Sequence, residues 1–321
     1  MAIDLKSFKK IRALVLGDLM IDEYLWGVVD RISPEAPVPI VTVQRESYTL
    51  GGAGNVINNL VAMGASVSVV GTAGTGEAGR LMLDKFKELR VDTGGILDEP
   101  DRPTTKKTRV IASNQQVLRI DKETKKEISP ATLKRLLSFI KEVAPRVDLI
   151  IISDYDKGLV TRELVKQTVA IAKTHNILTL ADPKGLDFTK YNRVSMLTPN
   201  QKEAGLATGI DIRTEEDLIR AGNKILAIAD LERLLITCGK EGMMLFERNK
   251  APFRIESEAR QVFDVSGAGD TVISTLGLAL AAKADFKESA AIANAAAGIV
   301  VAKVGTATTS PEELGKALEE R

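Results

Sequence analysis

Residues 264–271 (DVSGAGDT) place two glycines and a carboxylate directly before a long apolar stretch. Gly267 and Gly269 flank Ala268, so the backbone can turn tightly and direct its N–H groups to one point, at the positive end of the helix that we expect to follow. Such amides hold anionic oxygens, and Asp270 beside them could accept a proton from a substrate hydroxyl. The segment therefore predicts phosphoryl transfer. A glycine turn that only caps a helix is the alternative.

The composition is typical of an α/β enzyme and excludes several other classes. The 321 residues are 44% hydrophobic and 27% charged, which is enough to bury a large core as one sizeable domain. The 44 basic and 43 acidic side chains nearly cancel, so no global positive field draws a nucleic acid or a membrane surface to the protein. We therefore expect neither kind of partner.

Cysteine and histidine are too scarce for thiol chemistry or a zinc centre. Cys238 is the only cysteine and His175 the only histidine, which excludes an intrachain disulfide and a Cys/His zinc site. The first residues lack the apolar core of a signal peptide, and no uncharged stretch reaches membrane-spanning length. A cytoplasmic location is expected.

Apolar runs of strand length alternate along the chain with segments of helical period, which predicts a mainly parallel sheet with helices on both faces. The expected strands are residues 13–16, 67–71, 149–153, 178–181, 194–198 and 234–237. The expected helices are residues 55–63, 76–89, 130–143, 161–173, 215–229, 268–282 and 288–304. Ligands of such sheets bind beyond the carboxyl ends of the strands, and most of the polar motifs fall there.

A second glycine-rich segment lies upstream, at residues 50–59 (LGGAGNVINN). This segment and residues 264–271 resemble the two signatures of the PfkB carbohydrate kinases, a ribokinase-like family, and they occur in the expected order. The resemblance implies one α/β kinase domain over residues 1–321, built as a ribokinase-like three-layer sandwich. It also implies that the Gly51 and Gly52 amides and the Asn55 side chain hold sugar hydroxyls.

One region departs from the alternation of strands and helices. Residues 24–29 and 40–45 are extended in character, and proline-rich residues 31–39 join them. In PfkB kinases such an excursion, here at about 24–46 with a second candidate piece at 104–120, forms a small β lid over the sugar and pairs with a partner's lid. A homodimer is therefore expected from the resemblance. A rigid hairpin of purely structural use is the alternative.

The lid region also narrows the substrate. Residues 31–39 (RISPEAPVP) are similar to a segment of the bacterial heptose 7-phosphate kinases that serve ADP-heptose and lipopolysaccharide-core synthesis. The similarity continues through residues 17–22, 117–121, 153–158 and 181–185. It implies phosphorylation of D-glycero-β-D-manno-heptose 7-phosphate at its C1 hydroxyl. In related bacteria such a kinase is often fused to an adenylyltransferase, so the chain is expected to be a separate kinase or one domain of a longer protein.

Several charged side chains are candidates to bind the sugar phosphate. Asp18 and Asp22 follow the first expected strand, where short carboxylates can accept hydrogen bonds from sugar hydroxyls; capping of a turn is the alternative. Asp154 ends an apolar strand and is expected at the binding edge rather than in the core. A distal phosphate needs cations, and guanidinium groups bind phosphate through two parallel hydrogen bonds. The candidates for this role, each of which could equally be a solvated residue, are Arg109, Arg119 and Lys157.

The nucleotide side of the site is expected from three further segments. Asn200 and Glu203 match the family's Asn-x-x-Glu pattern, in which the acid acts on Mg²⁺ through water; helix capping is the alternative. The resemblance implies two further groups of candidates: Thr237, Gly239, Lys240 and Gly242, in a glycine turn that in the family passes near the nucleotide phosphates, and Asn294 and Gly298, which resemble positions that border adenine. A hairpin turn and close helix packing explain these two groups equally well.

These residues predict in-line transfer of the ATP γ-phosphoryl group, with Asp270 as base and the amides of residues 266–269 as anion hole. A monovalent cation near residues 301–306 is a further expectation. Residues 71–76 lack the lysine of a Walker A loop and fit a dinucleotide fingerprint only loosely. The remaining alternatives are a PfkB kinase of another sugar, sugar phosphate or nucleoside, and a non-catalytic sugar-binding relative.

Overall fold

The computed structural model describes residues 4–99, 101–113, 115–259 and 261–320. Over this part of the chain the main sheet has nine strands in the order β13-β12-β11-β10-β9-β8-β1-β4-β5. The strands from β11 to β5 are parallel, whereas β12 and β13 are antiparallel to their neighbours. The bounds are Arg12–Gly17 (β1), Ser66–Ala73 (β4), Asp92–Asp98 (β5), Leu149–Ser153 (β8), Leu178–Asp182 (β9), Met196–Leu197 (β10), Arg233–Thr237 (β11), Met243–Glu247 (β12) and Phe253–Ile255 (β13).

Helices cover both faces of the main sheet because its strands are apolar on both sides. In β1, Ala13 and Val15 belong to one core cluster, whereas Leu14 and Leu16 belong to the other. The first cluster is closed by α1 (Ala53–Ala62), α2 (Glu77–Glu88), α7 (Ala268–Ala281), α8 (Phe286–Val301) and α9 (Pro311–Glu319). The second is closed by α3 (Pro130–Val143), α4 (Arg162–Thr174), α5 (Gln201–Thr208) and α6 (Glu215–Ile228).

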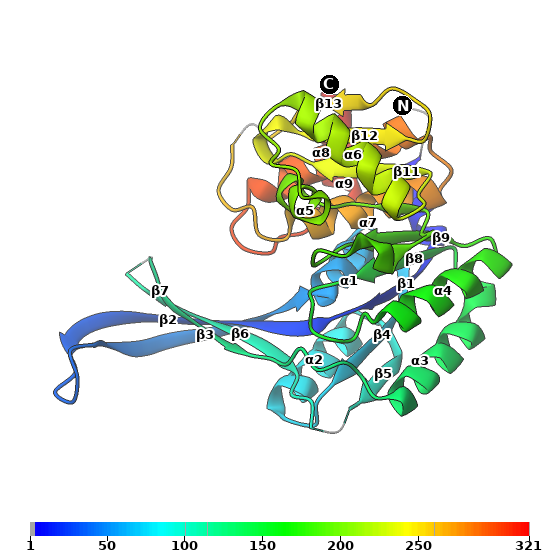
Figure 1. The fold of residues 1–321 in the computed structure, drawn as a ribbon. Helices are drawn as coiled ribbons and strands as arrows, with labels where there is room; N and C mark the ends of the chain where they lie inside the picture. Colours follow the sequence, from blue (N-terminus) through cyan, green and yellow to red (C-terminus); the bar gives the residue numbers. More distant parts are fainter. Residues whose placement is uncertain (1–3, 100, 114, 260, 321) are drawn as a thin grey trace.

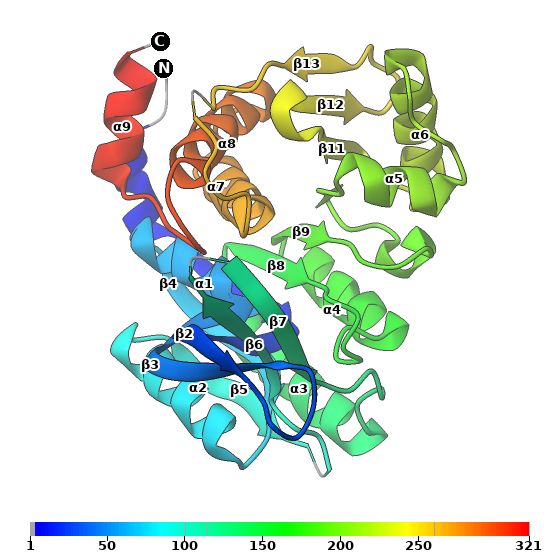
Figure 2. The same ribbon diagram turned by 90° about the vertical axis from the view of Figure 1, so that its left-hand side faces the viewer.

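Short 3₁₀ helices lie at Leu5–Lys10 (η1), Ala144–Arg146 (η2), Phe188–Tyr191 (η3) and Gly239–Glu241 (η4). Leu5 of η1 and Leu314 of α9 lie in the same core cluster, so the two ends of the described chain pack together (Figures 1 and 2). None of the described helices is long and apolar enough to cross a membrane.

A second sheet, which we call the arm, projects from the body (Figure 1). In the described residues it has four strands in the order β3-β2-β6-β7, and Figure 2 shows it in front of the main sheet. The strands are β2 (Leu19–Ile32), β3 (Pro39–Gly52), β6 (Thr105–Ala112) and β7 (Gln115–Lys122). β2 pairs antiparallel with β3 and parallel with β6, which pairs antiparallel with β7. The start of β2 and the end of β3, where Leu19 pairs with Gly52, lie beside α1 at the base of the arm.

The predicted α/β architecture is confirmed. Every expected strand and helix is present, and most boundaries agree within a few residues. Among the described strands and α-helices, β5, β12, β13 and α9 were outside the expected set, and α5 was foreseen only through the helix-capping alternative for Asn200 and Glu203. The excursion expected at about 24–46 corresponds to most of β2 and β3, and the candidate piece at 104–120 to β6 and most of β7.

Candidate active site

The amino end of α7 carries Asp270 and the two glycines that flank Ala268. Gly267 is the residue before the helix and has φ +80°, a left-handed conformation that favours glycine. Asp264 organises the preceding loop, because its carboxylate accepts the Ser266 N–H at 2.9 Å and the Gly305 N–H at 3.1 Å. The loop therefore presents the start of α7 in one fixed geometry.

Not all of the expected anion-hole amides are free. The Ser266 N–H donates to Asp264, and the Ala268 N–H donates to the Val265 carbonyl at 3.2 Å. The amides of Gly267 and Gly269 have no acceptor among the described residues. Four free amides were expected, from Ser266 to Gly269. Two remain, because those of Ser266 and Ala268 donate hydrogen bonds within the turn.

Asp270 is buried and both of its carboxylate oxygens accept hydrogen bonds. The Asn55 Nδ2 donates to Oδ2 at 2.7 Å, and the Tyr155 hydroxyl donates to Oδ1 at 2.8 Å. Burial raises the pKa of Asp270 to about 6; these two hydrogen bonds act in the opposite direction, and nearby Asp22 adds to the increase. A carboxylate with a pKa near neutrality can both take and release a proton at physiological pH.

The glycines at the start of α1 allow the first signature to approach the second. Gly52, with φ +56°, is the residue before the helix. A β-carbon at Gly51 would lie 2.2 Å from Asp22 Oδ2, and one at Gly267 would lie 2.5 Å from Asn55 Nδ2. Asn55 Oδ1 is buried without a partner among the described residues, so one acceptor at this point is left for a ligand hydroxyl.

Asp18 holds a turn of the chain instead of facing an open cavity. Its carboxylate accepts the N–H groups of Tyr155 at 2.9 Å, Lys157 at 3.1 Å and Leu159 at 3.3 Å. Burial and the Asp154 carboxylate raise the pKa of Asp18 to about 6, against the effect of these three amides. This arrangement favours the turn-capping alternative for Asp18 over direct contact with a sugar.

Asp22 and Arg109 form an ion pair at the root of the arm. The Arg109 guanidinium also lies 5.2 Å from the centre of the Tyr24 ring and contributes to a lowered pKa of Asp264. Arg109 therefore lies between the arm and the loop before α7. Lys107 is the register partner of Asp22, so it shares the face of the arm that meets the site.

Lys107 belongs to a chain of opposite charges on this face. Its Nζ lies 3.5 Å from oxygens of both Asp121 and Glu123, and Lys157 Nζ lies 2.8 Å from Glu123. Arg119 binds Asp121 through two nitrogens at 2.8 and 3.0 Å and its side chain is half exposed. Of the expected cations, Arg109 and Lys157 thus lie near the site, and Arg119 lies further out on the arm.

Asp154, which was expected at the binding edge rather than in the core, is buried. Tyr191 donates its hydroxyl to Asp154 Oδ2 at 2.6 Å, and Lys190 forms an ion pair with the same oxygen. The Asp156 N–H donates to Oδ1 at 2.8 Å. The carboxylate is therefore fully occupied in joining β8 to η3.

The Asn200 and Glu203 pair forms a capping box at the start of α5. Asn200 Oδ1 accepts the Glu203 N–H at 2.9 Å, and Glu203 Oε2 accepts the Asn200 N–H at 3.0 Å. Glu203 Oε1 also receives Lys184 Nζ at 2.6 Å. Burial and the Glu203 and Asp270 carboxylates raise the pKa of Asp182 well above its usual range, so acidic groups gather here between α5 and α7.

Two of the segments expected on the nucleotide side lie together. The Thr237 N–H donates to the Pro199 carbonyl at 3.0 Å, and Thr237 forms a β-bridge with Asn200. After Thr237 the chain turns through η4 into β12, with Gly239 at φ +58° and Gly242 at φ +86° flanking Lys240 and Glu241. This segment is the hairpin that the alternative interpretation described, and its position beside Asn200 is compatible with both interpretations.

Asn294 and Gly298 lie on α8 beside a pocket of about 750 Å³. Asn294 Nδ2 donates to the Glu256 carbonyl at 2.8 Å. Gly298 lines the pocket together with Ala295, Ile299, Ala302, Glu258, Gln261, Ala317 and Glu320. Its small apolar wall could receive a flat ring.

Residues 301–306 contact the loop that precedes α7. The Val301 carbonyl accepts the N–H groups of Phe263 at 2.8 Å and Asp264 at 3.2 Å. Because Gly305 also donates to Asp264, the segment expected near a monovalent cation supports the loop before α7 directly.

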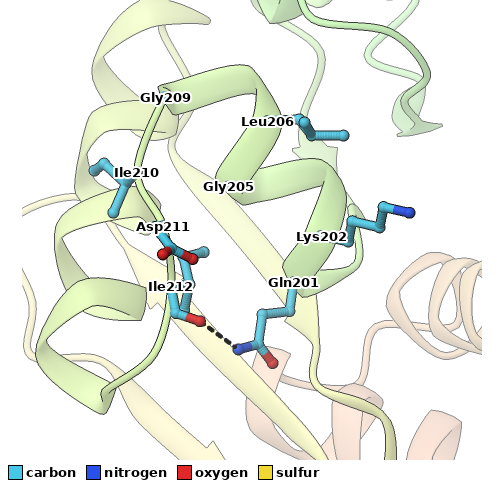
Figure 3. A pocket seen from close by; sticks show the side chains of 8 residues that line it. All are labelled: Gln201, Lys202, Gly205, Leu206, Gly209, Ile210, Asp211 and Ile212. Carbon is cyan, nitrogen blue, oxygen red and sulfur yellow. Dashed lines mark hydrogen bonds between the residues drawn. The ribbon is translucent and has the colours of Figure 1, made fainter.

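Another pocket lies between α5 and the chain that follows it (Figure 3). Gln201 crosses it to donate to the Ile212 carbonyl at 3.4 Å, and Lys202 and Asp211 are its charged residues. No expected site residue lines it, and its residues do not converge on one point (Figure 3).

Sequence reasoning missed three side chains of the site. Tyr155 and Lys107 lie within quoted segments, but neither type is a usual base or a bidentate phosphate ligand, so neither drew attention. Asp182 ends β9, and Asp154 comes directly after β8, so both lie at the carboxyl ends of neighbouring strands, and that similarity was the available signal.

Comparisons with known proteins show the family of the chain. A family model described as pfkB family carbohydrate kinase matches residues 10–313. "Bifunctional protein HldE" of Desulfatibacillum aliphaticivorans is 54% identical over 318 residues, which are 99% of this chain and 65% of that protein. The protein of the same name from Geobacter metallireducens is 50% identical over 95% of this chain and 62% of its own length. The chain thus spans less than two thirds of these relatives.

Solved structures with the same fold are more distant in sequence. Arabidopsis thaliana ribokinase, complexed with ribose and ATP, has a TM-score of 0.77 at 19% identity and covers 96% of this chain and 99% of its own. Escherichia coli phosphofructokinase-2, in complex with potassium, has a TM-score of 0.80 at 18% identity and covers 97% and 98%. At such identities the likeness shows the fold alone.

Proposed function

Because the chain belongs to the pfkB family of carbohydrate kinases, we propose that it transfers the γ-phosphoryl group of ATP to the C1 hydroxyl of D-glycero-β-D-manno-heptose 7-phosphate. The product is the heptose 1,7-bisphosphate, an intermediate toward ADP-heptose. Support for the heptose comes from the relatives named HldE, whose similarity covers nearly the whole chain.

The observation that carries the proposal is the meeting of the two glycine signatures. Asn55, from the first, donates to Asp270, from the second, at 2.7 Å, and Gly51 and Gly267 leave room for this approach. A sugar hydroxyl held by the free Asn55 Oδ1 would lie beside the Asp270 carboxylate. The amides of Gly267 and Gly269 would face the phosphate that this hydroxyl attacks.

In the proposed mechanism Asp270 takes the proton of the C1 hydroxyl as the oxygen attacks the γ-phosphorus. The bond between that phosphorus and the bridging oxygen of ADP breaks in line with the attack, and ADP leaves. The two free amides stabilise the charge that develops on the transferring oxygens. Positioning and charge stabilisation supply most of the acceleration, since no covalent intermediate is needed.

The residues near α5 fit a magnesium ion bound with the nucleotide. Glu203 and Asp182 place two carboxylates close enough that the pKa of Asp182 is raised, and a divalent cation would relieve this repulsion. Magnesium would supply neutralisation of the phosphate charge. Lys184, paired with Glu203, and the turn from Thr237 to Gly242 would contact the phosphates, and Asn294 and Gly298 would border adenine.

The far phosphate of the heptose is proposed to meet the cationic face of the arm. Arg109 and Lys157 lie near the site, and Lys107 stands between them. Lys107 Nζ is 3.5 Å from the nearest carboxylate oxygens of Asp121 and Glu123, which is a long distance for an ion pair. A phosphate would give Lys107 a closer and fully charged partner. Arg119 would extend this face outward.

A homodimer through the arm is also proposed. Leu118 and Ile120, two residues apart on one face of β7, are 54% and 52% exposed. Val28, Val29 and Val43 add exposed apolar surface further along the arm, which projects from the body (Figure 1). A second copy of the arm would cover this surface.

An assay of ADP release over a panel of sugars and sugar phosphates tests the function. Turnover greatest with the heptose 7-phosphate is expected. Preference for an unphosphorylated sugar or a nucleoside would identify another kinase of the family, and no turnover with any acceptor would favour a non-catalytic sugar-binding protein.

A further inference from the structure

Tyr155 lies against the proposed base but has no part in the mechanism above. It sits in the turn that follows β8, and its hydroxyl donates to Asp270 Oδ1 at 2.8 Å. The Asn55 amide holds the other carboxylate oxygen at 2.7 Å. Two donors from different elements, the turn after β8 and α1, therefore fix the plane of the Asp270 carboxylate at the start of α7.

The turn that carries Tyr155 is itself held by a buried carboxylate. Asp18 accepts the main-chain N–H groups of Tyr155, Lys157 and Leu159 between 2.9 and 3.3 Å. The main chain of Asp18 is tied at both ends, since its N–H donates to the Ser153 carbonyl at 3.2 Å and its carbonyl accepts the Ala53 N–H at 3.1 Å. The position of the Tyr155 ring is therefore coupled to β1, β8 and α1 together.

The direction of the hydrogen bond between Tyr155 and Asp270 is settled by the charges around it. Burial and the carboxylates of Asp270, Asp182 and Asp22 raise the pKa of Tyr155 well above its usual range, so the hydroxyl keeps its proton. Asp22 from β2 opposes the ionisation of Asp270. Asp182 from β9 is also near, and the Asp270 carboxylate contributes to the raised pKa of Asp182. Among the described residues, the hydrogen bonds from Asn55 and Tyr155 act the other way and lower the pKa of Asp270.

We propose that Tyr155, anchored by Asp18, is a positioning residue that keeps the Asp270 carboxylate ionised and aimed at the acceptor hydroxyl. The inference rests on the proposed role of Asp270 as the base. Tyr155 donates the same hydrogen bond before and after proton transfer and gives up no proton itself. Its contribution is greatest when Asp270 is charged, because a hydrogen bond to a carboxylate is stronger than one to a neutral acid.

Replacement of the hydroxyl tests this role through the pH profile of kcat. Tyr155→Phe removes a donor to the charged form, so the acid limb should move up by about one pH unit, the value of one hydrogen bond to a charged group. 3-Fluorotyrosine at position 155 keeps the size and is a stronger donor, so it should move the limb in the opposite direction. The phosphates of substrate and nucleotide titrate in the same range, and the readout is therefore the difference between each variant and wild type.

Tyr191→Phe is the matched control. Tyr191 is also buried and donates its hydroxyl to a buried carboxylate, Asp154, at 2.6 Å, but Asp154 is distinct from the base. This variant should lose stability without moving the acid limb. Equal shifts in the Tyr155 and Tyr191 variants would show a global effect and overturn the proposal.

Two further outcomes would also overturn it. If the acid limb of the kcat profile stays in place in both variants at position 155, Tyr155 does not influence the ionisation of Asp270. If only the KM for the sugar rises, the Tyr155 hydroxyl contacts the substrate instead. Failure of the proposed function is distinguishable, because the wild-type protein would then show no preference for the heptose 7-phosphate in the ADP-release assay. Retained turnover in Asp270→Asn with wild-type Tyr155 would instead remove the base on which this inference rests. If Tyr155→Phe does not fold, the fluorotyrosine variant decides the question alone.

Discussion

Asn55 and Asp270, which are 215 residues apart in the sequence, are joined by a hydrogen bond of 2.7 Å between two buried side chains. This bond brings the start of α1 and the start of α7 to one point at the carboxyl edge of the main sheet. In the proposed reaction one residue orients the acceptor and the other deprotonates it. The predictions below follow from that arrangement.

Asp270→Asn should lower kcat by about 10²- to 10⁴-fold, the usual contribution of general base catalysis. The fold should persist, because the substitution preserves shape. The measurement is ADP release under saturating sugar and nucleotide, with circular dichroism to verify folding. Asp84→Asn, on the exposed face of α2, is the control. Turnover within a few-fold of wild type would remove Asp270 from the role of base.

The burial of Asp270 should also make the free energy of unfolding depend on pH. Its folded pKa of about 6 lies above the ordinary 3.8, so between about pH 4 and pH 6 the folded state binds more protons than the unfolded state. The contribution of this group to stability therefore falls as pH rises through that window. Asp270→Asn should gain stability relative to wild type from pH 4 to pH 7, as measured by urea unfolding. A constant difference would contradict the raised pKa.

Lys107→Ala should raise KM for the phosphorylated heptose by about 10-fold or more, the loss of one charge-assisted hydrogen bond to phosphate. The KM for the unphosphorylated sugar should hardly change. Lys106→Ala is the matched control, because Lys106 points to the opposite face of β6 and pairs with Glu23 at 2.9 Å. Equal effects of both variants would show a general loss of charge instead of a phosphate contact.

Gly267→Ala should destabilise the protein by about 2 kcal/mol or more, because an L residue is strained in the left-handed region and its β-carbon would collide with Asn55. Gly269→Ala is the comparison, since a β-carbon at Gly269 meets nothing within 4 Å. It lies within the first turn of α7, where alanine should leave stability unchanged or raise it by about 0.5 kcal/mol. Urea unfolding of both variants checks the pair, and equal losses would refute the steric argument.

The double variant Leu118→Lys/Ile120→Lys should convert a dimer into monomers, because charges on the exposed face of β7 cannot be buried against a second copy. Sedimentation velocity measures the change. Leu206→Lys is the control, because Leu206 is also 55% exposed but lies on α5, away from the arm. A monomeric wild type, or a dimer that survives the double variant, would exclude the arm as the interface.

The fold was predictable because its signals are local. Apolar runs such as residues 149–153 have no polar face, and this marks a strand that is covered on both sides. The ribokinase-like class expected from the two glycine signatures was confirmed. β12 and β13 were missed because a short antiparallel hairpin at a sheet edge lacks the alternation of strand and helix on which the prediction depended.

For the candidate site, which side chains lie together was more predictable than which contacts they make. Glycines at 51, 52 and 267 are required by backbone conformation or close approach, and such needs are visible in sequence. The hydrogen bonds of Asp18 are not visible in sequence, since its partners are three main-chain amides that any residue type could supply. Tyr155 was missed for a similar reason: only the shape of its turn brings its hydroxyl to Asp270.

The order of the strands in the main sheet has a consequence for synthesis of the chain. β1 pairs with β4 and β8, so the centre of the sheet and the residues from Asp18 to Asn55 can assemble before the ribosome has reached α7. The proposed base and the amides proposed to face the phosphate arrive together on one late segment. If these roles hold, a nascent chain that already has its proposed sugar-binding groups cannot transfer phosphate until α7 emerges.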